Sequence, residues 1–261
     1  MTSRFKLILI SFILFSVIYY VRVTVQQNKA QDLHDIHIGE RGNKKIANFL
    51  QAKKIAYKMY KNKQRTFYCD CPYLGKQIIY DTCSYHPRDE SNIRSLRVEW
   101  EHIVPVSFFG RSFLSWKRGH KKCRSNKKRA FKGRKCARLV SSEFRKIEAD
   151  LYNLVPVIGE LNARRSNYPM GLLERALIPL GNVCQTFVAD GMVQPRKSIR
   201  GLIARTYKYM DNSYPYRGII SNRNRKLFDR WDNKYPLSED EIKRAKKIER
   251  IQGNRNHYVV K

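Results

Sequence analysis

Six cysteines lie downstream of an apolar N-terminal run, and this combination constrains the fold more than any other feature of the 261-residue chain. The run extends from Leu7 to Val21 and follows Arg4 and Lys6, an order of charge and hydrophobicity that is typical of a secretory signal. Exported chains meet an oxidising compartment, where an even number of cysteines indicates disulfides. We therefore expect a periplasmic or secreted fold stabilised by three disulfide bonds.

The cysteine spacing tests the alternative that these residues bind zinc. No Cys-x-x-Cys pair occurs, and Cys69-x-Cys71 is tighter than the two to four residues that usually separate zinc ligands. Disulfides are the better interpretation, although six cysteines allow fifteen pairings and the spacing does not choose among them. The candidate disulfide cysteines are Cys69, Cys71, Cys83, Cys123, Cys136 and Cys184.

The N-terminal residues leave two outcomes open. Residues 1–24 form a cleaved signal peptide or, as the second choice, a membrane anchor, because no clear small-x-small cleavage site follows the run. An apolar run of about 15 residues is short for a membrane span of about 20. We expect residues 25–44 to be polar and mobile, with His34-Asp35-Ile36-His37 as an adventitious metal binder, and residues 45–261 to form one domain.

The charge balance limits the partners of this chain. Lys and Arg number 53 against 22 Asp and Glu, which gives a formal net charge of +31. The 42% hydrophobic and 12% aromatic content is too high for a disordered polycation, so the excess charge must lie mostly on a folded surface. Such a surface favours nucleic acid or an anionic membrane as partner.

Positive charge is concentrated between Arg111 and Arg138. This segment holds 13 Lys and Arg and no Asp or Glu, which indicates a loop suited to phosphate. Blocks of like charge usually stay solvated, but Cys123 and Cys136 lie within this one and indicate that it is pinned. The candidate nucleic-acid-binding residues of this segment are Lys117, Lys121 and Lys122.

Hydrophobic periodicity predicts an α+β fold that is mostly helical, with small antiparallel sheets. A hairpin is expected from strands at 67–71 and 77–80, with a turn at 72–75, and a short strand is expected at 97–100. Apolar spacing and capping residues predict helices over 46–60, from Ser141 or Ser142 to about 150, and over 160–166, 200–210, 227–235 and 239–252.

The dipeptide Glu101-His102 follows the strand expected at 97–100 and carries the candidate chemistry. A carboxylate is a hard ligand for magnesium, which often uses one or two protein ligands, and an amide oxygen such as that of Asn153 can be the second. An imidazole is largely unprotonated near neutral pH and can take a proton from water. Such a dipeptide is more often two polar residues on the surface, or a buried histidine satisfied by hydrogen bonds. The pair alone therefore does not establish a catalytic site.

Longer stretches of sequence decide whether Glu101-His102 is a catalytic pair or a structural one. Seven stretches of the chain resemble, in the same order, the endonuclease I family, which comprises exported bacterial nucleases of the ββα-metal (His-Me finger) class. The similarity covers roughly residues 46–259. The stretches are Phe67–Cys71, Arg97–Pro105, Gly133–Cys136, Glu148–Glu160, Ile203–Tyr207, Trp231 with Tyr235–Pro236, and Ile251–Asn254.

This resemblance implies roles for several residues. Glu101 and Asn153 match metal ligands, His102 matches the general base, and the metal motif would be two strands leading into a helix that bears Asn153. The resemblance implies cleavage of DNA, and of RNA as well, with little sequence preference and 5′-phosphate ends. The implied cofactor is Mg²⁺, with Mn²⁺ or another divalent cation as alternatives.

Two strings compete for the arginine that stabilises the transition state in the resembling family. Gly133-Arg134-Lys135-Cys136 keeps an arginine, whereas Gly119-His120-Lys121-Lys122-Cys123 follows Trp116 but lacks one. We favour Arg134, because its guanidinium can bind two phosphate oxygens at once. On this alignment residues 123–130 form an insertion, and a pairing of Cys123 with Cys136 is plausible.

Arg165, Arg205 and Asn162 lie in or beside the resembling stretches. They could contact phosphate or support the metal ligands, and salt bridging on a helix surface is the alternative for both arginines. The resulting hypothesis is a monomeric, exported, magnesium-dependent, sequence-nonspecific endonuclease without an obligate protein partner. A catalytically impaired nucleic-acid-binding protein on the same scaffold is the alternative, and a cationic membrane-surface protein tethered by its N-terminus is a third interpretation.

Overall fold

The computed structural model describes residues 15–23, 26, 41–83, 85–173 and 184–260. The chain divides into two compact units, Met1–Glu40 and Arg41–Lys261. In the first unit, residues 15–23 are helical. No helix in the described ranges has both the length and the apolar character needed to cross a membrane. The candidate metal binder His34-Asp35-Ile36-His37 and most of the expected signal segment lie outside the described residues.

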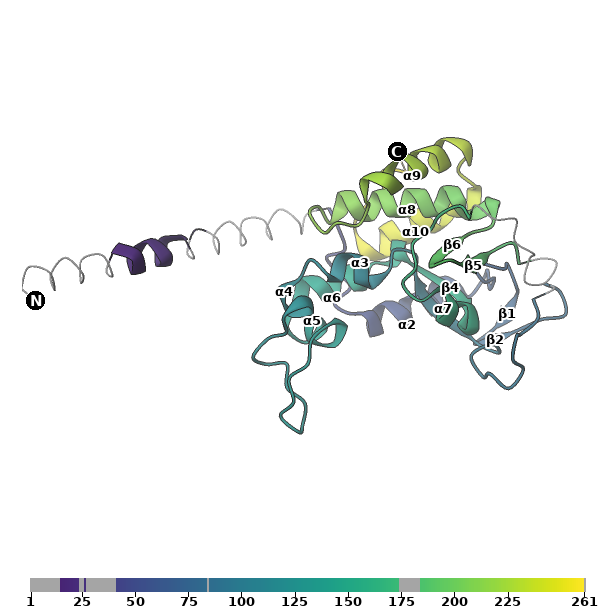
Figure 1. The fold of residues 1–261 in the computed structure, drawn as a ribbon. Coiled ribbons are helices and arrows are strands. Elements are labelled where there is room, and N and C mark those ends of the chain that lie inside the picture. The colour runs from purple at the N-terminus through teal and green to yellow at the C-terminus, as the bar shows by residue number, and fades with distance from the viewer. Residues whose placement is uncertain (1–14, 24–25, 27–40, 84, 174–183, 261) are drawn as a thin grey trace, which may run out of the picture. The chain divides into compact units, whose positions relative to one another are not determined.

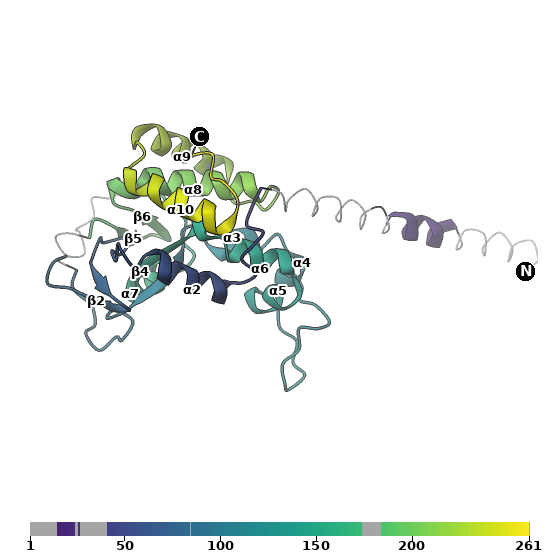
Figure 2. The same ribbon diagram turned by 180° about the vertical axis from the view of Figure 1, so that it is seen from behind.

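The second unit is mostly helical, as the sequence predicts, and Figure 1 and Figure 2 show it from two sides. Its α-helices are α2 (Phe49–Met59), α3 (Val106–Gly110), α4 (Leu114–Lys117), α5 (Arg134–Val140), α6 (Ser142–Glu148), α7 (Gly159–Arg165), α8 (Arg200–Ser213), α9 (Asn222–Lys234) and α10 (Glu239–Gln252). Two short 3-10 helices are η1 (Leu151–Asn153) and η2 (Lys197–Ile199).

Three small antiparallel sheets have two strands each within the described part of the chain. Their strands are β1 (Tyr73–Leu74) with β2 (Gln77–Ile78), β3 (Val98–His102) with β4 (Leu154–Ile158), and β5 (Phe187–Ala189) with β6 (Met192–Gln194). The sheets are too small to form a layer of their own, so helices supply most of the core.

Capping residues explain why the helices begin where the sequence predicts. The side chains of Asn48, Ser141 and Ser238 accept hydrogen bonds from backbone N–H groups in the first turns of α2, α6 and α10. Each cap satisfies a donor that has no partner within its helix. The helices expected at 46–60, 160–166, 200–210, 227–235 and 239–252 are all confirmed, with small shifts of their ends.

Three expectations are corrected. The first strand of the N-terminal hairpin is Tyr73–Leu74, and residues 67–71 form a turn instead, in which Asp70 has a φ of 57°. The basic segment 111–138 is interrupted by the short helices α4 and α5. The end of the polar segment is packed, because Asn43 is 3% exposed and its backbone N–H donates to Tyr214 Oη at 2.8 Å.

The β3–β4 pair followed by α7 is the element that positions the candidate site. Register pairs Glu101 with Val155 and His102 with Leu154, and every residue of β4 is buried. Gly159 lets α7 begin close against β3, because a Cβ at this position would lie 2.6 Å from the carbonyl oxygen of Arg94. The start of β3 and the first turn of α7 are therefore held side by side, and the last turn of α7 brings Arg165 to the end of β3.

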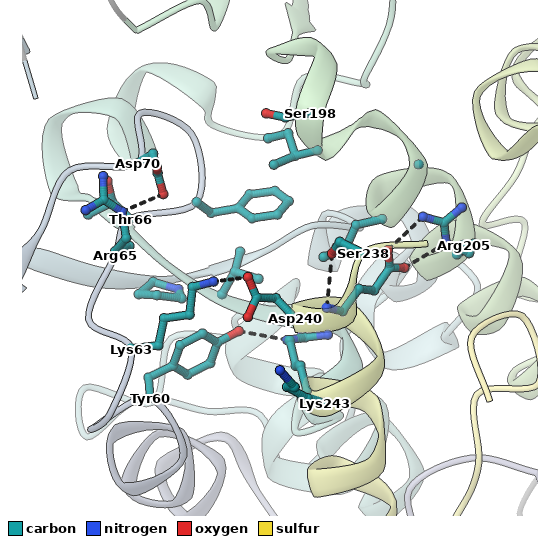
Figure 3. Close-up of a pocket in the computed structure, with 18 of the residues that line it drawn as sticks. Tyr60, Lys63, Arg65, Thr66, Asp70, Ser198, Arg205, Ser238, Asp240 and Lys243 are labelled. Carbon is teal, nitrogen blue, oxygen red and sulfur yellow. Dashed lines mark hydrogen bonds and ion pairs between the residues drawn. The ribbon is translucent and has the colours of Figure 1, made fainter. Parts of the chain in front are cut away.

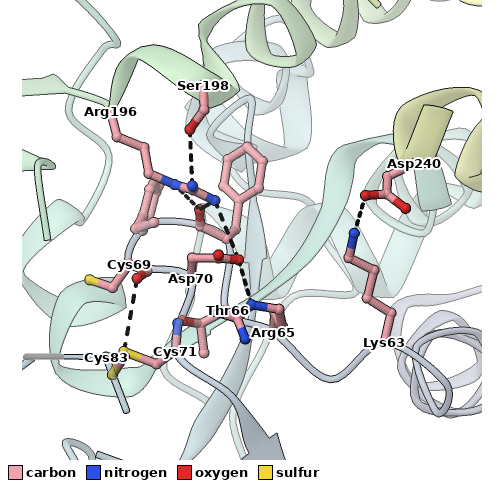
Figure 4. Close-up of polar contacts among 12 residues, drawn as sticks. Lys63, Arg65, Thr66, Cys69, Asp70, Cys71, Cys83, Arg196, Ser198 and Asp240 are labelled. Atoms are coloured by element: carbon pink, nitrogen blue, oxygen red, sulfur yellow. Dashed lines mark hydrogen bonds and ion pairs between the residues drawn. A yellow bond between two sulfur atoms is a disulfide. The ribbon is translucent and has the colours of Figure 1, made fainter. Parts of the chain in front are cut away.

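The described cysteines form three disulfides, Cys69–Cys184, Cys71–Cys83 and Cys123–Cys136. The pairing of Cys123 with Cys136 confirms the expectation from the resemblance. Two bridges meet in the turn at residues 67–71, where Figure 4 shows Asp70 between Arg65 and Arg196. Disulfides therefore tie this turn both to Cys83, 12 residues after Cys71, and to Cys184, 115 residues after Cys69.

A buried carboxylate ties η1 to the C-terminal helices. Asp150 is fully buried and accepts hydrogen bonds from Tyr209 Oη and Tyr214 Oη, both at 2.7 Å, and from Gln252 Nε2 at 3.0 Å. It also caps η1 through the backbone N–H of Tyr152. One side chain thus satisfies four donors from three parts of the chain.

We predict that Asp150→Ala lowers the free energy of unfolding by about 3 kcal/mol or more, because four buried donors lose their acceptor. Urea denaturation measures the change. The control is Asp229→Ala, whose carboxylate is 52% exposed and paired with Lys208, and which should change stability by less than about 1 kcal/mol. Equal effects of the two substitutions would contradict the role assigned to Asp150.

We also predict unequal contributions of two disulfides to stability. Cys69–Cys184 closes a separation of 115 residues and Cys71–Cys83 one of 12. Loop entropy makes the first worth about 2 kcal/mol more than the second. Comparison of the two double Cys→Ala variants by urea denaturation checks this order, and a larger loss for the short loop would refute it.

Candidate active site

The end of β3 places Glu101 and His102 together at a cavity of about 350 Å³. Both residues are 5% exposed, so their chemistry operates largely out of bulk water. Other parts of the chain complete the wall of this cavity. They contribute Phe49 from α2, Ser107 from α3, Arg134 from α5, and Asn162 and Arg165 from α7.

The imidazole of His102 is neutral and oriented. Burial, and then the positive charge of Arg134, lower the pKa of His102 to about 3. Its Nε2 lies 2.8 Å from the backbone carbonyl oxygen of Glu148. Because a carbonyl can only accept, Nε2 carries the proton and Nδ1 is the unprotonated nitrogen. The ring of Phe49, with its centroid 4.9 Å away, packs against the imidazole.

The carboxylate of Glu101 is fixed through one of its oxygens. Oε1 accepts from Arg165 Nη1 at 2.7 Å and from Tyr68 Oη at 3.2 Å. Burial raises the pKa of Glu101, and the charge of Arg165 opposes this shift. Both side-chain donors bind Oε1, so Oε2 is the oxygen that could coordinate a cation.

Arg165 does not lie where it could contact phosphate, which was one of the roles expected for it. Its side chain is 1% exposed, and besides Glu101 it donates to the backbone carbonyls of His102 and Ile103, each at 2.6 Å. A guanidinium with these partners positions the strand end that carries both candidate residues. Of the roles expected for Arg165, support of a candidate metal ligand fits these contacts, because the guanidinium holds Glu101; the salt bridge is present but buried rather than on the helix surface.

Arg134, from the string that keeps the arginine, lines the same cavity as Glu101 and His102. It pairs through Nε with Glu148 Oε1, while Arg138 pairs with Glu148 Oε2. Its side chain remains 39% exposed, so its outer guanidinium nitrogens can reach a substrate. Glu148 thus holds the arginine by its side chain and the histidine by its backbone.

Asn153 is not where we expected the second metal ligand. It ends η1 before β4, so the helix that follows the two strands does not bear it. Both ends of its amide bind Val104: Oδ1 accepts from the backbone N–H at 2.7 Å, and Nδ2 donates to the carbonyl at 3.1 Å. The side chain is fully buried and closes the loop after β3.

Asn162 occupies the position that we expected for Asn153, because it lies on α7 and lines the cavity with Glu101. Its Nδ2 donates to Glu99 Oε2 at 3.0 Å, which orients the amide and leaves Oδ1 as the free acceptor end. A carboxylate oxygen and an amide oxygen suit a hard divalent cation that keeps several waters. The described residues contain no cluster of three or more His, Cys, Asp or Glu side chains that would form a closed metal cage.

Ser107 adds a further polar group to this cavity. Its Oγ is buried and has no hydrogen-bond partner among the described residues. Buried polar atoms without partners are rare in folded proteins. A hydroxyl of this kind, in the cavity that Glu101 and Asn162 also line, fits a site whose ligand supplies the missing hydrogen bond.

The remaining basic candidates divide into two groups. Arg205 is 3% exposed and forms ion pairs with Glu241 at 2.7 Å and Asp232 at 3.0 Å, so it is structural and does not contact phosphate. Lys117, Lys121 and Lys122 are exposed. Of these four residues, the three lysines are accessible to a substrate from solvent.

A larger cavity lies elsewhere and differs in kind. It measures about 670 Å³ and is lined by α10 and the segment before β1, as Figure 3 shows. Its carboxylates pair with cations: Asp70 with Arg65, Asp240 with Lys63 and Glu241 with Arg205. No histidine is among the described residues that line it. The larger cavity therefore offers neither an imidazole base nor an unpaired carboxylate among its described lining residues.

The smaller cavity combines three capabilities: an unprotonated imidazole nitrogen, oxygen ligands for a cation, and an arginine. Such a combination can activate water and stabilise an anionic transition state. Sequence reasoning missed Tyr68 and Glu148 as supports of this site. Both lie inside stretches that carried the resemblance, and this was the available signal.

Comparison with known proteins gives a consistent result. The Endonuclease I family model matches residues 24–261. The chain is 40% identical over 226 residues to Endonuclease-1 of Buchnera aphidicola subsp. Acyrthosiphon pisum, covering 84% of this chain and 82% of the relative. It is 36% identical over 220 residues to a periplasmic deoxyribonuclease of Aeromonas hydrophila (82% and 85%) and also to an extracellular deoxyribonuclease of that species (82% and 89%). The chain belongs to the Endonuclease I family.

Proposed function

We propose that this protein is an exported, divalent-metal-dependent endonuclease that hydrolyses phosphodiester bonds of DNA, and of RNA as well, with little sequence preference. The supporting observation is that the unprotonated Nδ1 of His102, the carboxylate of Glu101 and the guanidinium of Arg134 belong to one cavity. The succession β3, β4 and α7 has the order of a ββα-metal core and presents both Glu101 and Asn162.

In the proposed mechanism, His102 Nδ1 takes a proton from a water molecule. The water oxygen attacks phosphorus in line, an O–P bond forms, and the bond from phosphorus to O3′ breaks. The products are a 5′-phosphate and a 3′-hydroxyl, whose oxygen takes a proton from solvent. The Nε2–H bond to the Glu148 carbonyl stabilises the imidazolium that forms, and the negative phosphate favours it further.

Arg134 donates hydrogen bonds to the non-bridging oxygens, where negative charge increases in the transition state. Its pairing with Glu148 fixes its direction before substrate binds. Glu101 and Asn162 would hold a magnesium ion. When bound, this ion supplies positive charge that stabilises the phosphorane and the departing oxygen. Asn153 keeps the role of closing the loop after β3.

Substrate binding would rest on the phosphate backbone. Lys117, Lys121 and Lys122 are exposed in the sequence segment that leads to Arg134. Contacts to phosphate and sugar carry no direct base information, so weak sequence preference follows. The three disulfides and the names of the periplasmic and extracellular relatives support action outside the cytoplasm.

We predict that His102→Ala abolishes cleavage of supercoiled plasmid DNA in magnesium, with a loss of at least about 100-fold, because the proton acceptor is absent. DNA retention in a gel-shift assay should remain near the parent value, since the phosphate-binding cations are unchanged. The parent protein with a chelator is the matched control.

Cleavage that persists in the His102→Ala variant would rule out the assigned base. Chelator-insensitive cleavage by the parent protein would exclude the metal. Binding without cleavage by the parent protein in magnesium or manganese would instead favour the alternative of a catalytically impaired nucleic-acid-binding protein.

We further predict that two asparagine substitutions act differently. Asn162→Ala should raise the magnesium concentration needed for half-maximal activity about tenfold or more and change stability little, because it removes a cation ligand from a half-buried position. Asn153→Ala should lower the free energy of unfolding by about 2 kcal/mol or more, because Val104 loses two buried hydrogen bonds. Magnesium titration and urea denaturation of both variants distinguish the roles, and the opposite pattern would restore Asn153 as the ligand.

A further inference from the structure

A long part of the chain lacks acidic side chains altogether. No Asp or Glu occurs from His102 to Ser142, a span that passes through the candidate site and beyond it. We call residues 117–135 the basic finger. All of its Lys and Arg side chains except Arg134 are exposed and without an ion pair among the described residues. These are Lys117, Arg118, Lys121, Lys122, Arg124, Lys127, Lys128, Arg129, Lys132 and Lys135.

The basic finger has an ordered tip. Arg124 pairs with Ala130 as an antiparallel bridge, and the backbone N–H of Ser125 donates to the Arg129 carbonyl at 2.9 Å. A second bond runs from the N–H of Lys128 to the Ser125 carbonyl at 2.8 Å. The tip is therefore a closed turn that presents Lys127, Lys128 and Arg129 together.

The base of the basic finger is fixed beside the candidate site. The Cys123–Cys136 disulfide is fully buried and ties the finger to α5. The backbone N–H of Gly133 donates to the Trp116 carbonyl at 3.0 Å, which closes the base. The next residue, Arg134, lines the cavity of His102. The finger thus begins where the scissile phosphate would lie.

The finger then leads away from the site. Figure 1 and Figure 2 both show the segment between α4 and α5 projecting from the body of the protein. Arg129 lies five positions before Arg134 in the sequence, and Lys127 lies seven positions before it. At about 3.3 Å per extended residue, the tip lies up to roughly 20 Å from Arg134. That distance corresponds to about five or six base pairs of a duplex at 3.4 Å each.

We propose that the basic finger is a clamp for the phosphate backbone of duplex nucleic acid, in which Lys127, Lys128 and Arg129 contact phosphates about five base pairs from the cleaved bond. This inference rests on the proposed function and extends it, because it assigns a distant contact and a minimum length to the substrate. It also assigns a function to the insertion at residues 123–130, which the catalytic residues do not require.

A polynucleotide fits the finger better than an anionic membrane. Both partners carry phosphates, but the finger begins next to Arg134 and shares its base with the candidate site. A strand that enters that site must continue along one of its sides. The tip also shows no exposed large hydrophobic side chain among residues 123–130, whereas membrane-surface segments combine basic with apolar residues.

The test uses the full chain with Lys127→Gln, Lys128→Gln and Arg129→Gln. The matched control carries Arg223→Gln, Lys226→Gln and Arg230→Gln, which remove equal charge from the exposed face of α9. Affinity for a duplex of about 25 base pairs is measured against salt, with both sets placed in the His102→Ala background. Loss of three phosphate contacts should make the slope of log K against log salt less negative by about 2 to 3, whereas the control should keep the slope of the His102→Ala parent.

Cleavage provides a second readout with His102 intact. The tip variant should lose about tenfold in kcat/KM on the long duplex and little on a hairpin stem of about four base pairs, which is too short to reach the tip from any of its bonds. The unchanged short-substrate rate also shows that the variant is folded. An unchanged salt slope, or equal losses on both substrates, overturns the clamp.

Vesicles of phosphatidylglycerol serve as the competing partner. If the tip variant loses vesicle binding while its DNA salt slope is unchanged, the finger is a membrane contact and the proposal is wrong. Failure of the proposed function is distinguishable from failure of the clamp. If the proposed function is wrong, the parent protein does not cleave even the short substrate in magnesium, whatever the salt slope of DNA binding by the tip variant.

Discussion

The buried guanidinium of Arg165 holds the end of β3 in place, and the candidate site depends on this contact. It binds the Glu101 carboxylate and the carbonyls of His102 and Ile103, three successive residues at the strand end. A buried charge of this kind is costly without partners, so loss of the Glu101 carboxylate would leave the guanidinium without its counter-charge inside the protein. The β3–β4 register and the approach of α7 at Gly159 bring that guanidinium to its partners.

Glu148 connects the other half of the site. Its carbonyl fixes the proton on His102 Nε2, while its carboxylate holds Arg134 and Arg138. The histidine and the arginine therefore share one reference point at the end of α6, although they lie on β3 and α5. A shift of this residue would move both groups together. The neutral state of His102 has a different origin, since burial and the nearby Arg134 lower its pKa while the bond to the Glu148 carbonyl opposes this shift.

Local pattern predicted the longer helices well, and α10 begins after Ser238 and ends at Gln252 as expected, whereas the short helices α3, α4 and α5 were not predicted. Caps and apolar spacing lie within a few residues of each other, so one chain suffices to find them. The choice between Asn153 and Asn162 was beyond such reasoning, because Asn153 lies inside a resembling stretch and Asn162 just after it, and only the fold decides which side chain faces the cavity. Burial of Arg165 and Arg205 was hidden for the same reason, because their carboxylate partners are distant in sequence.

The turn at residues 67–71 links sulfur chemistry to the carboxylate at the centre of the site. Tyr68, which donates to Glu101, lies beside Cys69 and three residues before Cys71, and both cysteines are bridged to other parts of the chain. In a reducing environment neither bridge forms, and the phenol loses the covalent anchors on its C-terminal side. Assembly of a complete site thus depends on thiol oxidation, so a newly made chain in a reducing cytoplasm would hold its hydrolytic apparatus unfinished while it is near the genome of its own cell.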